Sequence, residues 1–186
     1  MSETAIDSVG GGQVSSNGGG GGPAVPPLVL STQYVRDLVF RVPGAPGVYA
    51  IQNIRPHVTL ALDVQVRRAQ EGHPVYEVTL LMGCTATTHV PVEGQDPPPV
   101  AFVVELAYSG IFTLQNVAQH IVEPMLLAEC PRLLFPFARA VLADITREAG
   151  FPPVMLQPID FVAFWQGKRA ANQAAQALPP ETTAVA

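Results

Sequence analysis

The chain has 186 residues, of which 48% are hydrophobic and 13% charged, and its formal net charge is -5. Its ten basic residues are scattered, which argues against a nucleic-acid-binding stripe or a polybasic membrane patch. The composition favours one globular domain with apolar surface left over for ligands or other subunits. We expect a cytoplasmic protein, because two cysteines make no disulfide framework and no run reaches the roughly 20 apolar residues of a membrane span. The first basic residue is Arg36, so no signal peptide is indicated.

Both ends of the chain have the composition of flexible segments. Residues 1–27 are rich in Gly, Ser and Pro, including five consecutive glycines at 18–22. Such a segment buries too little apolar surface to offset the entropy lost on ordering, so we expect a disordered tail. Residues 177–186 are expected to form a flexible C-terminal tail. The predicted folded domain therefore spans residues 28–176.

Alternation of apolar and polar residues predicts four strands, over 28–42, 58–66, 76–86 and 102–108. A Pro- and Gly-rich crossover loop at 43–56 separates the first two, and short turns between the later strands favour antiparallel pairing. In the first strand one face is predicted to carry Leu28, Leu30, Thr32, Tyr34, Leu38 and Phe40, and the other Ser31, Gln33, Asp37 and Arg41. The strand carboxylates Asp37, Asp63, Glu77 and Glu105 fall on polar faces and are expected to be solvated.

Helical spacing predicts an amphipathic helix over 136–149, with Pro136 in its first turn and Gly150 ending it. The segment 117–129 is weakly helical and interrupted by Pro124. Asp160 is a suitable N-cap for a last helix. Each predicted strand has one apolar face, so we expect the helices to cover the sheet in an α+β fold.

Residues that could carry catalysis or bind a metal do not form a recognisable pattern. There is no Walker loop, GxGxxG, HExxH or GxSxG motif. Cys84 and His89 are five residues apart, which places them on opposite faces of a strand. Cys130 precedes a proline and could be a reactive thiol at a helix entrance, although a buried structural thiol fits better. We therefore expect no catalytic residue, no metal and no cofactor.

Two loops are more hydrophobic than loops usually are. The crossover loop contains Tyr49, Ile51 and Ile54, and the loop after the predicted helix contains Phe151, Met155 and Leu156. Such loops either fill the core or line a groove. A small sheet with few helices needs extra cover, so the residue pattern by itself favours the core.

Four collinear motifs resemble the SecB protein-export chaperone family. They are RDLVFRVPGAPGVY at 36–49, VVELAYSGIFTL at 103–114, CPRLLFPFAR at 130–139 and GFPPVMLQPIDF at 150–161, within a likeness covering residues 30–167. The resemblance implies an α+β protomer with a four-stranded antiparallel sheet backed by helices, and a dimer-of-dimers tetramer. It also implies no enzymatic activity: the family holds unfolded secretory preproteins in the cytoplasm without ATP and delivers them to the SecA translocase ATPase.

The same resemblance implies two sets of site residues. The client-peptide groove would use Tyr49, Ile51, Ile54, Phe151, Met155, Leu156, Phe161 and Trp165. SecA docking would use Asp37, Arg41, Val103 and Glu105. Arg41 stands where the family usually has an acidic residue, so we expect weaker docking.

Three alternatives stay open from the sequence. The nearest is a SecB-like chaperone dedicated to one partner, such as an antitoxin. A thiol enzyme using Cys84 or Cys130 and a purely structural oligomerisation module are the others.

Overall fold

The computed structural model describes residues 26–51, 54, 56–94 and 96–177. Almost all of the predicted N-terminal tail and the last nine residues lie outside the described part of the chain. The elements are β1 (Leu28–Arg41), the 3-10 helix η1 (Gly47–Ala50), β2 (His57–Arg68), β3 (Val75–Thr87), β4 (Val100–Leu114), α1 (Gln119–Pro124), the π-helical segment η2 (Met125–Glu129), α2 (Cys130–Glu148) and α3 (Phe161–Ala177).

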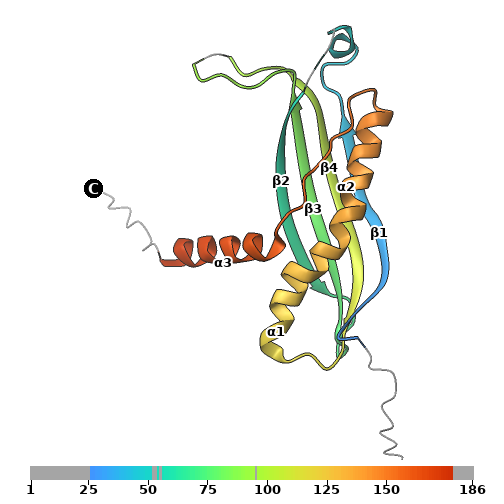
Figure 1. The fold of residues 1–186 in the computed structure, drawn as a ribbon, viewed down its shortest axis with the longest axis vertical. Coiled ribbons are helices and arrows are strands. Elements are labelled where there is room, and N and C mark those ends of the chain that lie inside the picture. The colour runs from blue at the N-terminus through green and yellow to red at the C-terminus, as the bar shows by residue number, and fades with distance from the viewer. Residues whose placement is uncertain (1–25, 52–53, 55, 95, 178–186) are drawn as a thin grey trace, which may run out of the picture.

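The four strands form one antiparallel sheet in the order β1-β4-β3-β2. Strands β2, β3 and β4 follow one another as a meander, and the crossover loop carries the chain from β1 at one edge to β2 at the other (Figure 1). The predicted α+β fold with a four-stranded antiparallel sheet is confirmed. Among the described residues, no helix is long and apolar enough to cross a membrane.

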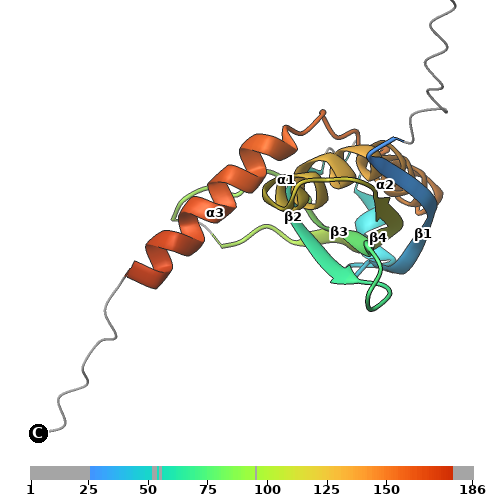
Figure 2. The same cartoon turned by 90° about the horizontal axis from the view of Figure 1, so that it is seen from below.

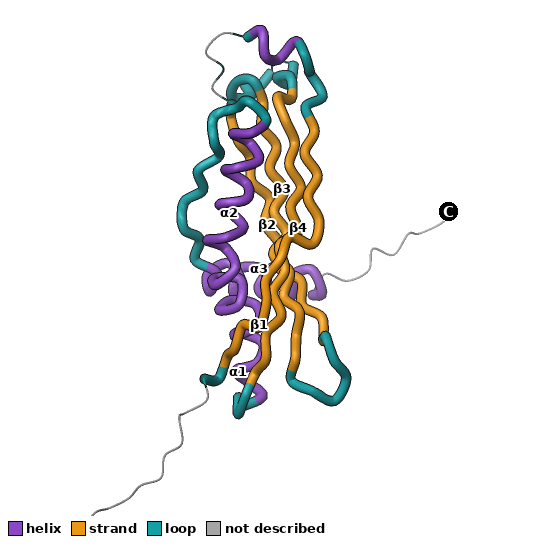
Figure 3. Tube along the Cα trace, turned by 90° about the vertical axis from the view of Figure 1, so that its right-hand side faces the viewer, coloured by secondary structure: helices purple, strands orange, loops and turns teal. Residues whose placement is uncertain are grey.

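The sheet has an inner face, which packs against α2, and an outer face, which α2 leaves uncovered (Figures 2 and 3). The central strands β3 and β4 supply most of the buried inner-face side chains, as their alternation predicts. These include Val78, Leu80, Met82, Cys84, Phe102, Val104, Leu106 and Phe112. The apolar faces predicted for β2, β3 and β4 are confirmed.

The face prediction for β1 was wrong in the middle of the strand. Its register with β4 shifts at Ser31 and again at Arg36, and each such β-bulge reverses the alternation of side chains. Between the bulges, Thr32 and Tyr34 therefore lie on the outer face and Gln33 on the inner face. After the second bulge the strand returns to the predicted alternation. Sequence alternation alone gives no sign of either bulge.

The helix covering the inner face is longer than predicted. It runs through α1, η2 and α2 without a break, so Pro136 lies inside α2 and not in its first turn. Proline leaves the carbonyl four residues earlier without its helical donor. That carbonyl belongs to Arg132. Arg132 and Pro136 are both exposed, so water can donate the missing hydrogen bond to this carbonyl. The C-terminus agrees with the prediction: Gly150 has φ 83° and the helix ends there.

At Gly110 of β4 the side chain of Leu134 from α2 lies very close to the sheet backbone. A Cβ at this position would lie 2.8 Å from Leu134 Cδ2 and 2.9 Å from Phe112 Cε2. Only a residue without a side chain leaves room for this approach. On the helix, Leu134, Ala138 and Leu142 are fully buried against the sheet.

The last helix, α3, extends past the β2 edge and runs across the strand direction (Figure 1). Its N-cap is Asp160, as predicted: Oδ1 accepts the backbone N–H groups of Val162 and Ala163, each at 3.0 Å. Farther along, Lys168 forms an ion pair with Asp63 of β2. Between these two points, Phe164 packs against the core and Trp165 Nε1 donates a hydrogen bond to Glu123 Oε1 of α1 at 3.4 Å.

Candidate functional site

An apolar hollow of about 310 Å³ lies at the inner face, where the loop after α2 passes the start of β2. It is lined by Pro56, Val58, Leu60, Phe102 and the loop residues 152–156. Met155 is 75% exposed at this hollow. Two of the predicted groove residues, Met155 and Leu156, therefore meet apolar side chains of β2 and β4.

A row of aromatic rings underlies the hollow. Ring centroids are 5.3 Å apart for Tyr49 and Phe151, 4.8 Å for Phe151 and Phe102, and 5.6 Å for Phe102 and Phe40. Phe151 is only 4% exposed, so in this protomer it fills the core. Tyr49 is half exposed, and its hydroxyl donates a hydrogen bond to the carbonyl of Ala149 at 2.9 Å. Tyr49 thereby ties the crossover loop to the end of α2.

The other predicted groove residues do not gather in the same place. Ile51 is exposed and Ile54 is partly buried. Phe161 is buried against Phe135, with ring centroids 5.7 Å apart. Trp165 lines a separate hollow of about 280 Å³ between α3 and η2. The structure thus divides the eight residues between the crossover-loop end and the α3 end.

The loop after α2 has an anchor that the sequence did not suggest. The Thr146 hydroxyl is fully buried, donates within its own helix to the Leu142 carbonyl at 2.9 Å, and accepts the backbone N–H of Val154 at 3.1 Å. A threonine near a helix end can serve many purposes, so its residue type carries no signal for this role. Thr146 sets the distance between α2 and the hollow's loop wall.

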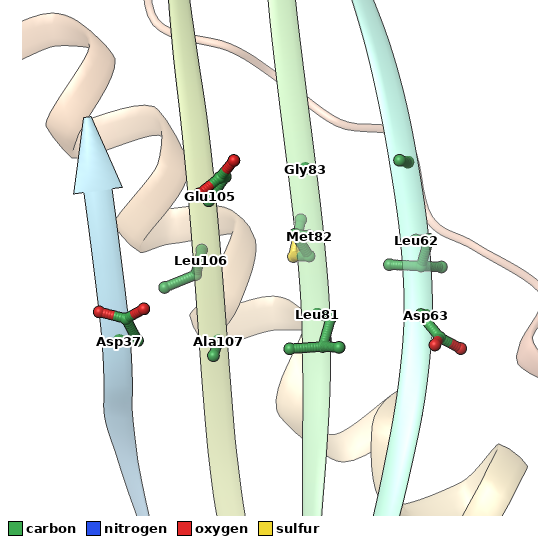
Figure 4. A pocket seen from close by; sticks show the side chains of 10 residues that line it. Asp37, Leu62, Asp63, Leu81, Met82, Gly83, Glu105, Leu106 and Ala107 are labelled. Carbon is green, nitrogen blue, oxygen red and sulfur yellow. The ribbon is translucent and has the colours of Figure 1, made fainter. Parts of the chain in front are cut away.

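The outer face carries a shallow acidic hollow of about 270 Å³ (Figure 4). Its charged residues are Asp37 of β1, Asp63 of β2 and Glu105 of β4, and its floor includes the small residues Ala61, Gly83 and Ala107. Small side chains on adjacent strands leave the depression between the carboxylates. Asp37 and Glu105 were both predicted as docking residues, and the hollow brings them together.

Basic side chains approach two of these three carboxylates. Arg41 Nη1 lies 3.9 Å from Glu105 Oε1, and both side chains are more than half exposed. Arg41 is directly opposite Val103 across the β1–β4 pairing, so these two predicted docking residues also share the outer face. Asp63 pairs with Lys168 of α3. The arrangement gives a physical basis for the prediction that Arg41 reduces the negative charge.

Glu77 is not solvated as expected, because its side chain is buried on the outer face. It accepts hydrogen bonds from the Tyr34 hydroxyl and from Arg67 Nε, and Arg36 Nη1 lies 3.6 Å from it. The β1 bulges bring Tyr34 and Arg36 outward over this carboxylate. Because the bulges were not foreseen, neither was this cluster.

The cysteines are buried and lack the features of reactive thiols. Burial raises the pKa of Cys84 to about 11, and burial together with the charge of Glu129 raises the pKa of Cys130 to about 12. Burial and a raised pKa are the opposite of what a reactive thiol needs, so neither cysteine supports the thiol-enzyme alternative. In the part of the chain that is described, no group of three His, Cys, Asp or Glu residues could hold a metal ion.

Residues 23–172 match the family described as "Preprotein translocase subunit SecB". This chain belongs to the SecB family. A "Protein-export protein SecB" from Granulibacter bethesdensis is 55% identical over 150 residues, covering 81% of this chain and 86% of the relative. The SecB of the same name from Acidiphilium cryptum is 50% identical over 155 residues, covering 80% and 92%. The resemblance seen in the four motifs is confirmed, and with it a SecB role in protein export.

A solved structure of a SecB-like chaperone from Mycobacterium tuberculosis, in complex with a peptide from an antitoxin, is also similar to this chain. Its TM-score is 0.57 at 11% sequence identity, and the match covers 71% of this chain and 90% of the other chain. At this identity the likeness shows the fold alone.

Proposed function

We propose that this protein acts without ATP as a chaperone that binds unfolded secretory preproteins in the cytoplasm and delivers them to the SecA translocase. The observation that carries the proposal is the 55% identity to a protein named "Protein-export protein SecB" over 81% of the chain. The two hollows, one apolar and one acidic, provide separate surfaces for the two partners that this role requires.

Client binding is supported by exposed apolar side chains on the crossover loop and at the apolar hollow. Ile51, Tyr49 and Met155 are 47%, 51% and 75% exposed. Unfolded chains present aliphatic and aromatic segments, and burial of such a side chain contributes about 1.5–3 kcal/mol. Methionine adapts to many partner shapes, so the surface suits clients of varied sequence.

The docking side of the proposal rests on the acidic hollow. Carboxylates in a shallow depression attract a basic partner and speed its encounter, with an effect that weakens as salt is added. We assign this surface to SecA, with Asp37 and Glu105 as charged contacts and Arg41 and Val103 beside them.

A homotetramer is the third part of the proposal. Leu133 and Phe137 are four residues apart on α2, lie on the side away from the sheet and are 44% and 48% exposed. Residues at this spacing form one stripe, and helix packing between protomers would cover it. Four copies of a weak client surface then raise avidity through effective concentration.

The alternative of a chaperone dedicated to one antitoxin is less well supported. Only the fold is shared with the antitoxin-binding chaperone, whereas the relatives at 50–55% identity are named for protein export. Affinity capture from the native host distinguishes the two: many secretory precursors support the export role, and a single partner contradicts it.

The decisive experiment combines native mass, client holding and SecA binding. A mass of four chains, suppression of aggregation of an unfolded preprotein without ATP, and salt-sensitive SecA binding are all expected. Failure to slow aggregation would contradict the general chaperone role and support a structural oligomerisation module.

A further inference from the structure

The three carboxylates of the acidic hollow differ in their basic neighbours. Glu105 lies near Arg41 and Asp63 pairs with Lys168. Within the described part of the chain, no Lys, Arg or His nitrogen lies within 4.0 Å of the Asp37 carboxylate. Among the described residues, Asp37 therefore has no basic partner, and its charge faces the hollow.

Arg36 is the residue placed to cancel that charge. It is the extra residue of the second β1 bulge, where the register passes from Val35 to Asp37. A bulge sets two successive residues against one residue of the neighbouring strand and interrupts the alternation. Arg36 therefore projects on the outer face beside Asp37, where the two side chains could form an ion pair.

The guanidinium of Arg36 turns to Glu77 instead. Its Nη1 lies 3.6 Å from Glu77 Oε2, and the Glu77 side chain is fully buried while that of Arg36 is 45% exposed. A buried carboxylate is strongly destabilising without cations and donors around it. Its attraction for a nearby cation is also greater than that of a solvated carboxylate, because the surrounding dielectric constant is lower.

We propose that Glu77 is a positioning residue for partner docking: it holds Arg36 away from Asp37 and so keeps the Asp37 carboxylate free for a basic group of SecA. This inference rests on the proposed docking of SecA at the acidic hollow. It makes a buried residue outside the hollow a determinant of the hollow's charge.

The first test is a rescue experiment with purified tetramer and SecA at low salt. Glu77→Gln keeps the side-chain shape and releases Arg36 to Asp37, so SecA affinity falls by about two- to five-fold. The double variant Glu77→Gln/Arg36→Gln regains parental affinity. A merely structural defect would not be repaired by a second substitution, so absence of rescue overturns the inference.

The double variant Glu77→Gln/Arg67→Gln is the matched control. Arg67 also pairs with Glu77 but lies on β2 and not beside Asp37. The SecA affinity of this double variant is expected to stay as low as that of Glu77→Gln alone. Equal rescue by both double variants would show a general charge effect and would overturn the assignment to Arg36.

A second test avoids the buried position, in case Glu77→Gln does not fold. Arg36 and Arg41 are both exposed residues of β1, and each loses one charge on replacement by Gln. Arg41→Gln frees Glu105 and tightens SecA binding by about two- to five-fold, whereas Arg36→Gln leaves binding unchanged. Equal tightening by both would mean that Arg36 already weakens Asp37, which contradicts sequestration by Glu77.

Asp37→Asn separates this inference from the proposed function. If it leaves SecA affinity unchanged, Asp37 is not a docking contact, and both this inference and the assignment of Asp37 to SecA docking fail. If it weakens binding but the rescue fails, only the role of Glu77 is overturned. A crystal structure of Glu77→Gln is expected to show the Arg36 guanidinium at the Asp37 carboxylate, and a guanidinium that stays apart from it counts against the inference.

Discussion

The Thr146 hydroxyl accepts the backbone N–H of Val154, 3.1 Å away, and this bond holds the loop after α2 against the helix. Replacement by Val keeps the shape and leaves the Val154 N–H buried without an acceptor. We expect Thr146→Val to lower the free energy of unfolding by about 1–3 kcal/mol and to speed hydrogen exchange at the Val154 amide. Thr146→Ser keeps the hydroxyl and is the control, because the Val154 amide should still exchange slowly in it. Equally fast exchange in both variants would show that the hydrogen bond does not hold the loop.

Gly110 offers a test of the contact between α2 and the sheet. A methyl group there meets Leu134 and Phe112 at distances shorter than normal packing allows, so Gly110→Ala should destabilise by about 1–3 kcal/mol in denaturant titration. Gly83 is a matched glycine on the neighbouring strand, where a Cβ would lie 3.5 Å from Ala61 Cβ. Gly83→Ala should therefore change the free energy of unfolding only slightly. An equal loss of stability in both variants would show that the close approach of α2 at Gly110 is not the cause.

Arg41 provides a gain-of-function prediction for docking. Arg41→Glu removes the cation beside Glu105 and adds a carboxylate to the same face, so SecA binding should tighten at low salt and the difference should shrink as salt rises. Arg139→Glu makes the same charge change on the exposed side of α2 and should have a much smaller effect. Unchanged or weaker binding by Arg41→Glu would count against the acidic hollow as the docking surface.

Client binding is best tested at exposed side chains, because truncation of the buried Phe151 would damage the core. The double variant Ile51→Ser/Met155→Ser removes two exposed apolar side chains, one on the crossover loop and one at the apolar hollow. We expect it to bind an unfolded preprotein several-fold more weakly, with an unchanged melting temperature and native mass. Val92→Ser, at an exposed site on the β3–β4 hairpin, is the control; full client capture by the double variant would remove these residues from the groove.

The buried thiols predict a pH effect on stability. The pKa of Cys84 rises from 9.0 to about 11 because the folded state disfavours the thiolate. Above roughly pH 9 the unfolded chain loses this proton and the folded chain keeps it, so the free energy of unfolding falls as pH rises further. Denaturant titrations from pH 8 to pH 10 should show this fall, and a Cys84→Ser/Cys130→Ser variant should show less of it. An identical pH profile would mean that the thiols titrate normally in the folded state.

Much of the architecture follows from the sequence, because alternation over long strands is a strong signal. Asp160 could be recognised as an N-cap and Gly150 as a helix end from residue type and spacing. The β1 bulges could not be, because the two reversals cancel and leave Leu28 and Phe40 on the same face as in a regular strand. The start of α2 was missed because a proline usually marks a first turn, whereas Pro136 is tolerated inside the helix on its exposed side.

In the candidate site too, local sequence features predict some residues, whereas others depend on contacts between distant segments. Loop hydrophobicity and family motifs were sufficient to select Met155 and Asp37, which line the two hollows. They could not separate Phe151, which fills the core, from its exposed neighbours, because both kinds of residue are apolar. Thr146 and Glu77 act through contacts with segments distant in sequence, which no local pattern records.

The bulges in β1 also bear on how a protein that handles extended chains protects itself. An open sheet edge with a regular row of free N–H and C=O groups can add a strand from another polypeptide. β1 is an edge strand, and its two bulges break that row into short pieces, with Arg36 and Asp37 at the second break. An edge interrupted in this way is a poor template for a strand of another polypeptide, so backbone pairing that could grow into an aggregate is disfavoured.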